Sequence, residues 1–225
     1  MADIYIVNKE DLEQVADKIR EKNETSDPIV FPDGFSSGID TVYNSARSDF
    51  KNIIARSVTE IEDDSVETVG MYGLANYTAL INVNFPNLKE IATRAFSGCT
   101  NLALTSLPDS ITYVGSYSFS GCSKLSLTSL SGKGINVRNG AFENCTGLTS
   151  MSLPESLTIG NLVFSGCSNL RSVTFRGIPA SIGANTFSGC TNLLTINVPW
   201  AEGEVEAAPW GAVNATVNYN YTEEE

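Results

Sequence analysis

The chain has no histidine among its 225 residues. Histidine is the usual general base of Ser–His and Cys–His nucleophile systems near neutral pH, so its absence excludes those catalytic classes. Basic residues are also scarce. The chain has 14 Lys and Arg and 26 Asp and Glu, which gives a net charge of −12. This charge opposes binding to nucleic acid and to anionic membranes, both of which require clustered Lys and Arg. No apolar run approaches the roughly 18–20 residues that span a bilayer.

Cysteine pairs at short spacing are missing as well. The five cysteines lie 22 or 23 residues apart, whereas zinc ligands come in pairs about two to four residues apart. An odd number of cysteines argues against a disulfide framework, and Met1–Ile6 has neither the basic nor the apolar region of a signal peptide. We therefore expect a soluble, acidic protein with buried free thiols, no metal and no other cofactor.

Carboxylates are the remaining candidates for catalysis or for a calcium site. They occur in runs at 60–64, 202–206 and 223–225. None of these runs follows the alternating Asp/Asn loop with glycine that binds calcium in an EF-hand. We interpret them as solvated faces and an acidic tail, and we predict no catalytic residue and no enzyme activity.

What the chain does contain is a repeat. Five times, a cysteine lies three residues after a phenylalanine, at a period that indicates one structural unit copied along the chain. The pairs are Phe96 and Cys99, Phe119 and Cys122, Phe142 and Cys145, Phe164 and Cys167, and Phe187 and Cys190. A more divergent sixth copy precedes them, with Leu74 at the phenylalanine position and Tyr77 at the cysteine position. The array is predicted to cover residues 57–199.

Each repeat contains two short runs with alternating hydrophobicity. In the fourth copy they are Leu148–Pro154 and Ser156–Gly160, which are too short for helices and end in proline or glycine. The Ala-Phe-x-x-Cys segment is then expected to form a tight turn or a single helical turn. One such coil cannot bury its apolar face alone, whereas stacked coils can. The sequence therefore predicts a mainly β solenoid of about six coils.

This pattern resembles the BspA-type leucine-rich repeat. The resemblance covers about residues 57–199 and rests on the five Phe–Cys copies. It implies a right-handed solenoid that serves surface adhesion and recognition and has no enzyme activity of its own.

The two ends lie outside the repeat. In residues 1–56, one helix is predicted after Asn8 and a second at Ser36–Ala55, with an apolar stripe along the second. This helical segment either caps the first coil or attaches the chain to a partner or to a second copy of itself, and both roles stay open. In residues 200–225, Trp200 and Trp210 are predicted to cover the last coil, and 215–221 to form a final edge strand before the acidic tail.

A second resemblance concerns these ends. Ala16–Thr25, Phe31–Ile39 and Val198–Ala212 look like segments of tail or baseplate-associated proteins in phages and prophages of Firmicutes. The resemblance implies a virion protein that is made in the host cytoplasm and attached to other tail proteins through residues 1–56.

A candidate ligand surface follows from the first strand of each repeat. Alternation places small polar side chains on its outer face. They are Asn82, Asn84, Ser106, Ser129, Ser150, Ser152, Ser172, Thr174, Thr195 and Asn197. In the repeats of Ser106 and Ser129, we expect a bulge to absorb an additional residue. Hydroxyls and amides suit a host cell-surface glycan better than a protein, although a protein partner stays open. The alternative is a Ser/Thr/Asn ladder that only stabilises the sheet.

Basic residues in edges and turns are other contact points, with no sequence reason to prefer one. They are Lys89, Arg94, Lys133, Arg138, Arg171 and Arg176.

Three functions are compatible with these features. The leading hypothesis is a phage tail or baseplate-associated protein that displays a host-recognition surface. The second is a BspA-like adhesin on the bacterial cell surface, and the third is a structural spacer of the virion that binds nothing.

Overall fold

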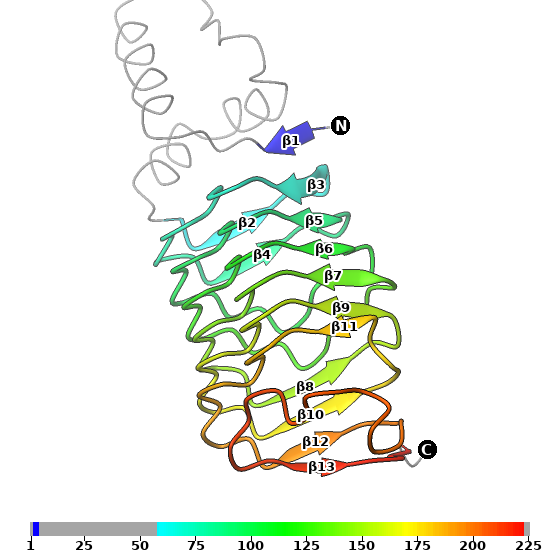
Figure 1. Cartoon of the computed structure of the whole chain (residues 1–225). Helices are drawn as coiled ribbons and strands as arrows, with labels where there is room; N and C mark the ends of the chain where they lie inside the picture. Colours follow the sequence, from blue (N-terminus) through cyan, green and yellow to red (C-terminus); the bar gives the residue numbers. More distant parts are fainter. Residues whose placement is uncertain (1, 5–57, 223–225) are drawn as a thin grey trace, which may run out of the picture.

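The computed structural model describes residues 2–4 and 58–222 (Figure 1). These residues form short strands joined by turns, and no helix occurs among them. Every strand pair is parallel. The residues paired across neighbouring strands lie about one repeat apart in the sequence, as Ile91 and Val114 do, and Val114 and Val137. The described residues therefore form a β solenoid of about seven turns, which confirms the mainly β stacked coils predicted from the repeat and exceeds the predicted number of about six.

One side of the solenoid is a continuous seven-stranded sheet. Its strands are β1 (Ala2–Ile4), β3 (Val66–Val69), β5 (Glu90–Ile91), β6 (Tyr113–Val114), β7 (Ile135–Val137), β9 (Leu157–Ile159) and β11 (Ser181–Ile182). From β3 to β11 each coil contributes one strand, formed by the second apolar run of the repeat. β1 pairs with β3 through Ala2–Val66 and Ile4–Val69, a pairing that the sequence did not predict.

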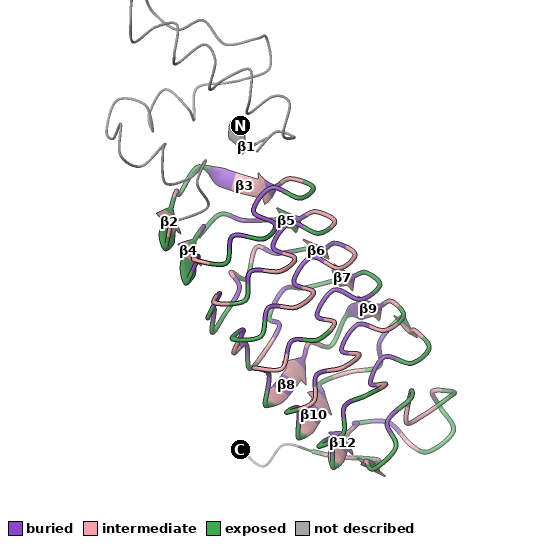
Figure 2. Cartoon of the chain, turned by 90° about the vertical axis from the view of Figure 1, so that its left-hand side faces the viewer, coloured by how far each residue is buried: buried purple, intermediate pink, exposed green. Residues whose placement is uncertain are grey.

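A second side, which we call the split face, is interrupted. It consists of a two-stranded sheet, β2 (Glu60–Glu62) and β4 (Asn82–Asn84), and of a four-stranded sheet. The four strands are β8 (Ser150–Leu153), β10 (Ser172–Phe175), β12 (Thr195–Asn197) and β13 (Thr216–Asn218). Between β4 and β8, residues 103–107 and 126–130 form no named strand, and a single bridge joins Ser129 to Ser152. In Figure 2, β2 and β4 are mostly exposed, whereas β8, β10 and β12 alternate between intermediate and buried residues.

The interruption has its cause in the position of one buried side chain. In each coil with a cysteine, the first-strand segment begins at the leucine three residues after the cysteine. Where this segment forms a strand, its middle buried residue is the fourth one, as in Met151, Val173 and Ile196. In the two interrupted coils it is the third, Leu104 or Leu127. Two outward residues in succession then precede the closing leucine, and strict alternation fails. The expected bulge around an extra residue is therefore not the explanation. The first and last apolar residues of these segments are five apart in every coil, and the extra residue lies after the segment.

The core is a column of phenylalanine rings. The five rings of the repeat are fully buried. Neighbouring rings lie with their centroids 5.2, 5.4, 5.4 and 5.8 Å apart and their planes within 4–8° of parallel. Such contacts fall within the range for stacked aromatic pairs. Each coil therefore packs its ring on that of its neighbours, which is why the repeat needs phenylalanine at this place.

The cysteines form a second column beside the rings. Each thiol donates to a backbone carbonyl of the preceding coil, and from Cys122 onward that carbonyl belongs to the preceding phenylalanine. The distances are 3.1, 3.1, 3.1 and 3.0 Å for Cys122, Cys145, Cys167 and Cys190, and 2.9 Å from Cys99 to the Leu74 carbonyl. Cysteine fits because it is small, apolar and still a weak donor. All five are free thiols, as predicted.

The C-terminal segment closes the column. The Trp210 ring lies 6.5 Å from that of Phe187, and Trp200 lies 5.4 Å from Phe175 in an edge-on arrangement. Both tryptophans are buried. β13 continues the ladder beyond residue 199, in register with β12. Both tryptophans thus pack at the C-terminal end of the array, and β13 forms within the predicted strand 215–221 but is shorter. The helices expected in residues 1–56 lie outside the described residues.

Candidate functional site

The four-stranded sheet presents two outward ladders of small polar side chains, which we call the polar strip. The first ladder is Ser150, Ser172, Thr195 and Thr216, in register across β8, β10, β12 and β13. The second is Ser152, Thr174, Asn197 and Asn218. Inward residues of the same strands, such as Met151 and Val173, are buried. The period-2 alternation expected of a half-buried strand therefore positions the strip.

The two ladders differ in how they use their hydrogen-bonding groups. In the second, Asn218 Nδ2 donates to Asn197 Oδ1 at 2.9 Å, and Asn197 Nδ2 donates to Thr174 Oγ1 at 3.2 Å. Ser152 Oγ, at the end of this ladder, is buried and has no partner within the described residues. In the first ladder, no described residue hydrogen-bonds the hydroxyls of Ser150, Ser172 or Thr195. These hydroxyls are available to a ligand.

The other predicted strip residues are placed elsewhere. Asn82 and Asn84 lie on β4 beside Glu60 and Glu62 of β2, so that part of the face is acidic. Ser106 is exposed in the interrupted segment and belongs to no strand. Ser129 meets the strip only through its bridge to Ser152. The structure thus brings together the six predicted residues of β8, β10 and β12.

Two members of the strip were missed. Thr216 and Asn218 complete the ladders on β13. The alternation that predicted this strand already assigned Val217 and Tyr219 to one side, so the same pattern placed Thr216 and Asn218 on the other.

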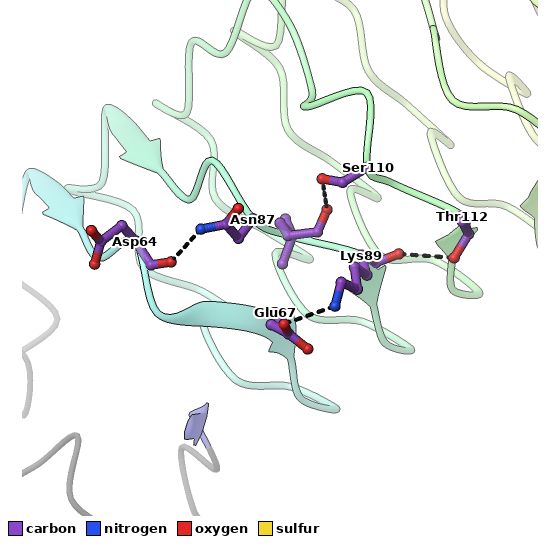
Figure 3. Close-up of polar contacts among 7 residues, drawn as sticks. Asp64, Glu67, Asn87, Lys89, Ser110 and Thr112 are labelled. Carbon is purple, nitrogen blue, oxygen red and sulfur yellow. Dashed lines mark hydrogen bonds and ion pairs between the residues drawn. The ribbon is translucent and has the colours of Figure 1, made fainter. Parts of the chain in front are cut away.

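Other polar contacts join successive coils and serve the fold. Asn side chains in the turn after the cysteine donate to carbonyls of the preceding coil, as Asn101 does to Thr78 at 2.7 Å and Asn169 to Thr146 at 2.9 Å. Figure 3 shows a comparable group near the N-terminal end of the array, where Lys89 Nζ lies 2.7 Å from Glu67 Oε1. The hydrogen bond and the charge of Lys89 lower the pKa of the Glu67 carboxyl.

The thiols show the opposite shift. Burial raises the pKa of Cys122, Cys145, Cys167 and Cys190, that of Cys190 to about 12. They stay protonated at neutral pH and are poor nucleophiles and poor metal ligands. Within residues 2–4 and 58–222, no group of three or more His, Cys, Asp or Glu side chains is placed to hold a metal ion. The same part of the chain contains no helix of the length and apolarity required to cross a bilayer.

A groove on the opposite, seven-stranded sheet was also missed. It has a volume of about 270 Å³ and lies along β7, β9 and β11 and the turns that follow them. Among the residues that the structure describes, Arg138 is the only charged one that lines it. Sequence reasoning named this residue among six basic contact points without preferring it. The signal that distinguishes it is its place in the repeat, because the equivalent residues of the other coils are glycine or alanine. They are Gly70, Ala92, Gly115, Gly160 and Gly183.

The solved structures that match the chain include leucine-rich repeat proteins. A Treponema pallidum leucine-rich repeat protein is 28% identical, with a TM-score of 0.50, over 60% of this chain and 63% of its own length. The chain thus spans less than two thirds of that protein. A leucine-rich repeat protein from Bacteroides ovatus is 21% identical, with a TM-score of 0.29, over 64% of this chain and 56% of its own.

A leucine-rich cell surface protein from Faecalibacterium prausnitzii is 21% identical, with a TM-score of 0.32, over 76% of this chain and 62% of its own. None of the curated proteins matches the chain. The model of the BspA type leucine rich repeat region matches residues 44–158 in six copies. With this match and the stacked Phe–Cys coils, the chain belongs to the BspA-type leucine-rich repeat family.

Proposed function

We propose that this protein is a non-enzymatic recognition or adhesion protein and that the polar strip binds a hydroxyl-rich glycan of a cell surface. The observation that carries the proposal is the first ladder. Its hydroxyls on Ser150, Ser172 and Thr195 lie in register and have no hydrogen-bond partner among the described residues. A sheet that needed this ladder only for stability would use it in cross-strand hydrogen bonds, as the second ladder does.

The chemistry of the strip favours a glycan over a protein partner. Its eight side chains are Ser, Thr and Asn, and none is charged or aromatic. Protein hot spots are enriched in Trp, Tyr and Arg, which the strip lacks. Neighbouring parallel strands lie about 4.8 Å apart and present similar donors and acceptors at that spacing. The strip therefore suits a polymer built from repeating units.

The proposed location is the bacterial cell surface, where the protein acts as a BspA-like adhesin. The family membership supports this location, which is the simplest setting for a glycan-binding solenoid. A phage tail or baseplate protein is the second candidate, with residues 1–56 attached to other tail proteins and the strip facing the host. The terminal segments that resemble tail-associated proteins of Firmicutes phages favour it. Labelling whole bacteria and purified virions with an antibody against the protein distinguishes a location on the bacterial cell surface from one on the virion.

Binding of the labelled full-length protein to an array of bacterial wall and capsular glycans tests the proposed ligand. In the test variant, Ser150→Gln, Ser172→Gln and Thr195→Gln place longer neutral side chains across the first ladder. In the control, Ser131→Gln and Ser156→Gln make the same kind of substitution at two exposed positions outside the strands. We expect selective binding that the control retains and the test variant loses at least about tenfold, since several hydrogen bonds are blocked. Binding to no glycan would leave the spacer function, and equal binding by all three proteins would place the site elsewhere.

A further inference from the structure

The groove on the seven-stranded sheet has the composition of a binding site. It lies at the part of this sheet formed by β7, β9 and β11 (Figure 1), away from the split face. Its volume of about 270 Å³ is slightly below that of pockets for drug-sized ligands, about 300–1,000 Å³. It therefore suits one small unit. Among the described residues, no Asp or Glu lines it, although the chain carries 26 of them.

Arg138 has no role in the fold that the structure reveals. It follows β7 at a place where every other coil has glycine or alanine, so the repeat itself does not require it. Its side chain is exposed and forms no ion pair with a described residue. A cation that breaks the repeat and lacks a structural partner is available for an anionic ligand.

Two amides beside Arg138 are fixed in orientation. Asn139 Oδ1 accepts from the Asn161 backbone N–H at 3.0 Å, and Asn161 Oδ1 accepts from the Ala184 N–H at 2.8 Å. Because a backbone N–H can only donate, each oxygen must face the next coil, and the Nδ2 group of each side chain keeps its donors. No described residue accepts from these Nδ2 groups. With the guanidinium, they make this part of the groove rich in donors.

The opposite part of the groove carries groups that match sugar hydroxyls. Thr158 and Ser181 supply hydroxyls on neighbouring strands, and Asn136 Oδ1 is buried without a partner in the described residues. Tyr113, the register neighbour of Asn136 on β6, is half-buried. Aromatic rings beside polar groups offer an apolar surface to the face of a sugar.

We propose that this groove binds a carboxylated sugar residue, with its carboxylate on Arg138 and the Nδ2 groups of Asn139 and Asn161. A planar guanidinium and two amide donors suit a carboxylate, and such charge-assisted bonds are strong. The remaining lining groups accept from and donate to the hydroxyls of the same sugar. An acidic peptide is less well matched, because its backbone and carboxylates offer fewer hydroxyls to Thr158, Ser181 and the buried Oδ1 of Asn136.

Titration of the full-length protein with sodium glucuronate, with N-acetylneuraminate and with glucose, followed by calorimetry or NMR, tests this site. Sodium acetate and inorganic phosphate serve as probes for simple anion binding. In the test variant Arg138→Gly, the coil acquires the glycine of its neighbours, which favours an intact fold. In the matched control Arg171→Gln, an exposed arginine is neutralised on the split face.

We expect at least one carboxylated sugar to bind more tightly than glucose and acetate, and Arg138→Gly to weaken it at least about tenfold. Arg171→Gln and the triple glutamine variant of the polar strip should bind it as the unaltered protein does. If the proteins bind the acidic sugar as expected but the triple variant binds the glycan array as the unaltered protein does, only the proposed function of the strip fails. The groove site would be overturned by a preference for glucose, by phosphate or acetate binding as tightly, or by equal losses in Arg138→Gly and Arg171→Gln.

Discussion

The seven-stranded sheet and the split face are built from the same repeats, yet one is continuous and the other is not. In the seven-stranded sheet, every coil from β3 to β11 supplies a strand whose last residue is a buried Val or Ile, or, in β11, a half-buried Ile182. On the split face, two coils supply none, because Leu104 and Leu127 are buried one place early. The coils between β4 and β8 nevertheless stack without a gap in the Phe and Cys columns.

This difference shows which parts of the repeat hold the solenoid together. The phenylalanine rings, the thiol hydrogen bonds and the seven-stranded sheet continue through coils in which the split face has no strand. Stability in such arrays comes from interfaces between neighbouring repeats, and here those interfaces lie in the columns. The first-strand segments are therefore free to vary, which is the condition for carrying a recognition surface.

The largest effect is expected in the middle of the phenylalanine column. Phe142→Ala removes a fully buried ring stacked between Phe119 and Phe164, and should lower the free energy of unfolding by about 3–5 kcal/mol. Ser150→Ala on the strip should change it by less than about 0.5 kcal/mol. Urea unfolding monitored by circular dichroism measures both. Similar losses in the two variants would end the distinction between the columns and the split face.

The thiol column predicts sensitivity to alkaline pH. Burial raises the pKa of Cys190 in the folded state to about 12, above the ordinary value of 9.0. The unfolded chain therefore loses this proton first, so the stabilisation is complete below about pH 9 and is lost as the pH rises toward 12. Urea unfolding from pH 8 to 11 should show falling stability, with a shallower fall in Cys190→Ala. An identical slope in the variant would contradict the coupling of these thiols to folding.

Exchanging two neighbouring residues should create a strand in one interrupted coil of the split face. Leu104→Thr together with Thr105→Leu moves the buried leucine to the fourth place, as in the coils that form strands. We expect slower hydrogen exchange of backbone amides 104–107, since the segment can then pair with β4. The reverse exchange in β8, Met151→Ser with Ser150→Met, should speed exchange there. If neither exchange alters these rates, the position of the buried residue does not decide strand formation.

The smallest effect is expected from the ion pair at the N-terminal end of the array. Lys89→Gln removes an exposed partner of Glu67 and should barely change stability at pH 7. Because Lys89 lowers the pKa of Glu67, the pair contributes above the ordinary value of about 4.5 and less as the pH falls through the folded value. Any difference between the two proteins should therefore shrink in acid, and a difference that grew in acid would contradict the assignment.

The repeat made most of the fold predictable. The Phe–Cys spacing predicted the stacked coils, their free thiols and the strip on β8, β10 and β12, because each of these follows from local period and alternation. The break at Leu104 and Leu127 was visible in the sequence, but its meaning depends on which side chains neighbouring coils bury. The groove around Arg138 was not predictable, because the orientations of Asn139 and Asn161 are set by backbone groups one coil away.

The central claim is that the polar strip is dispensable for folding and therefore available for recognition. Its most direct test is the free energy of unfolding of the triple variant Ser150→Gln, Ser172→Gln and Thr195→Gln, measured in urea beside the unaltered protein. The account predicts a change below about 1 kcal/mol, since these hydroxyls bond no described residue. A loss close to that of Phe142→Ala would contradict it and would make the strip a structural ladder.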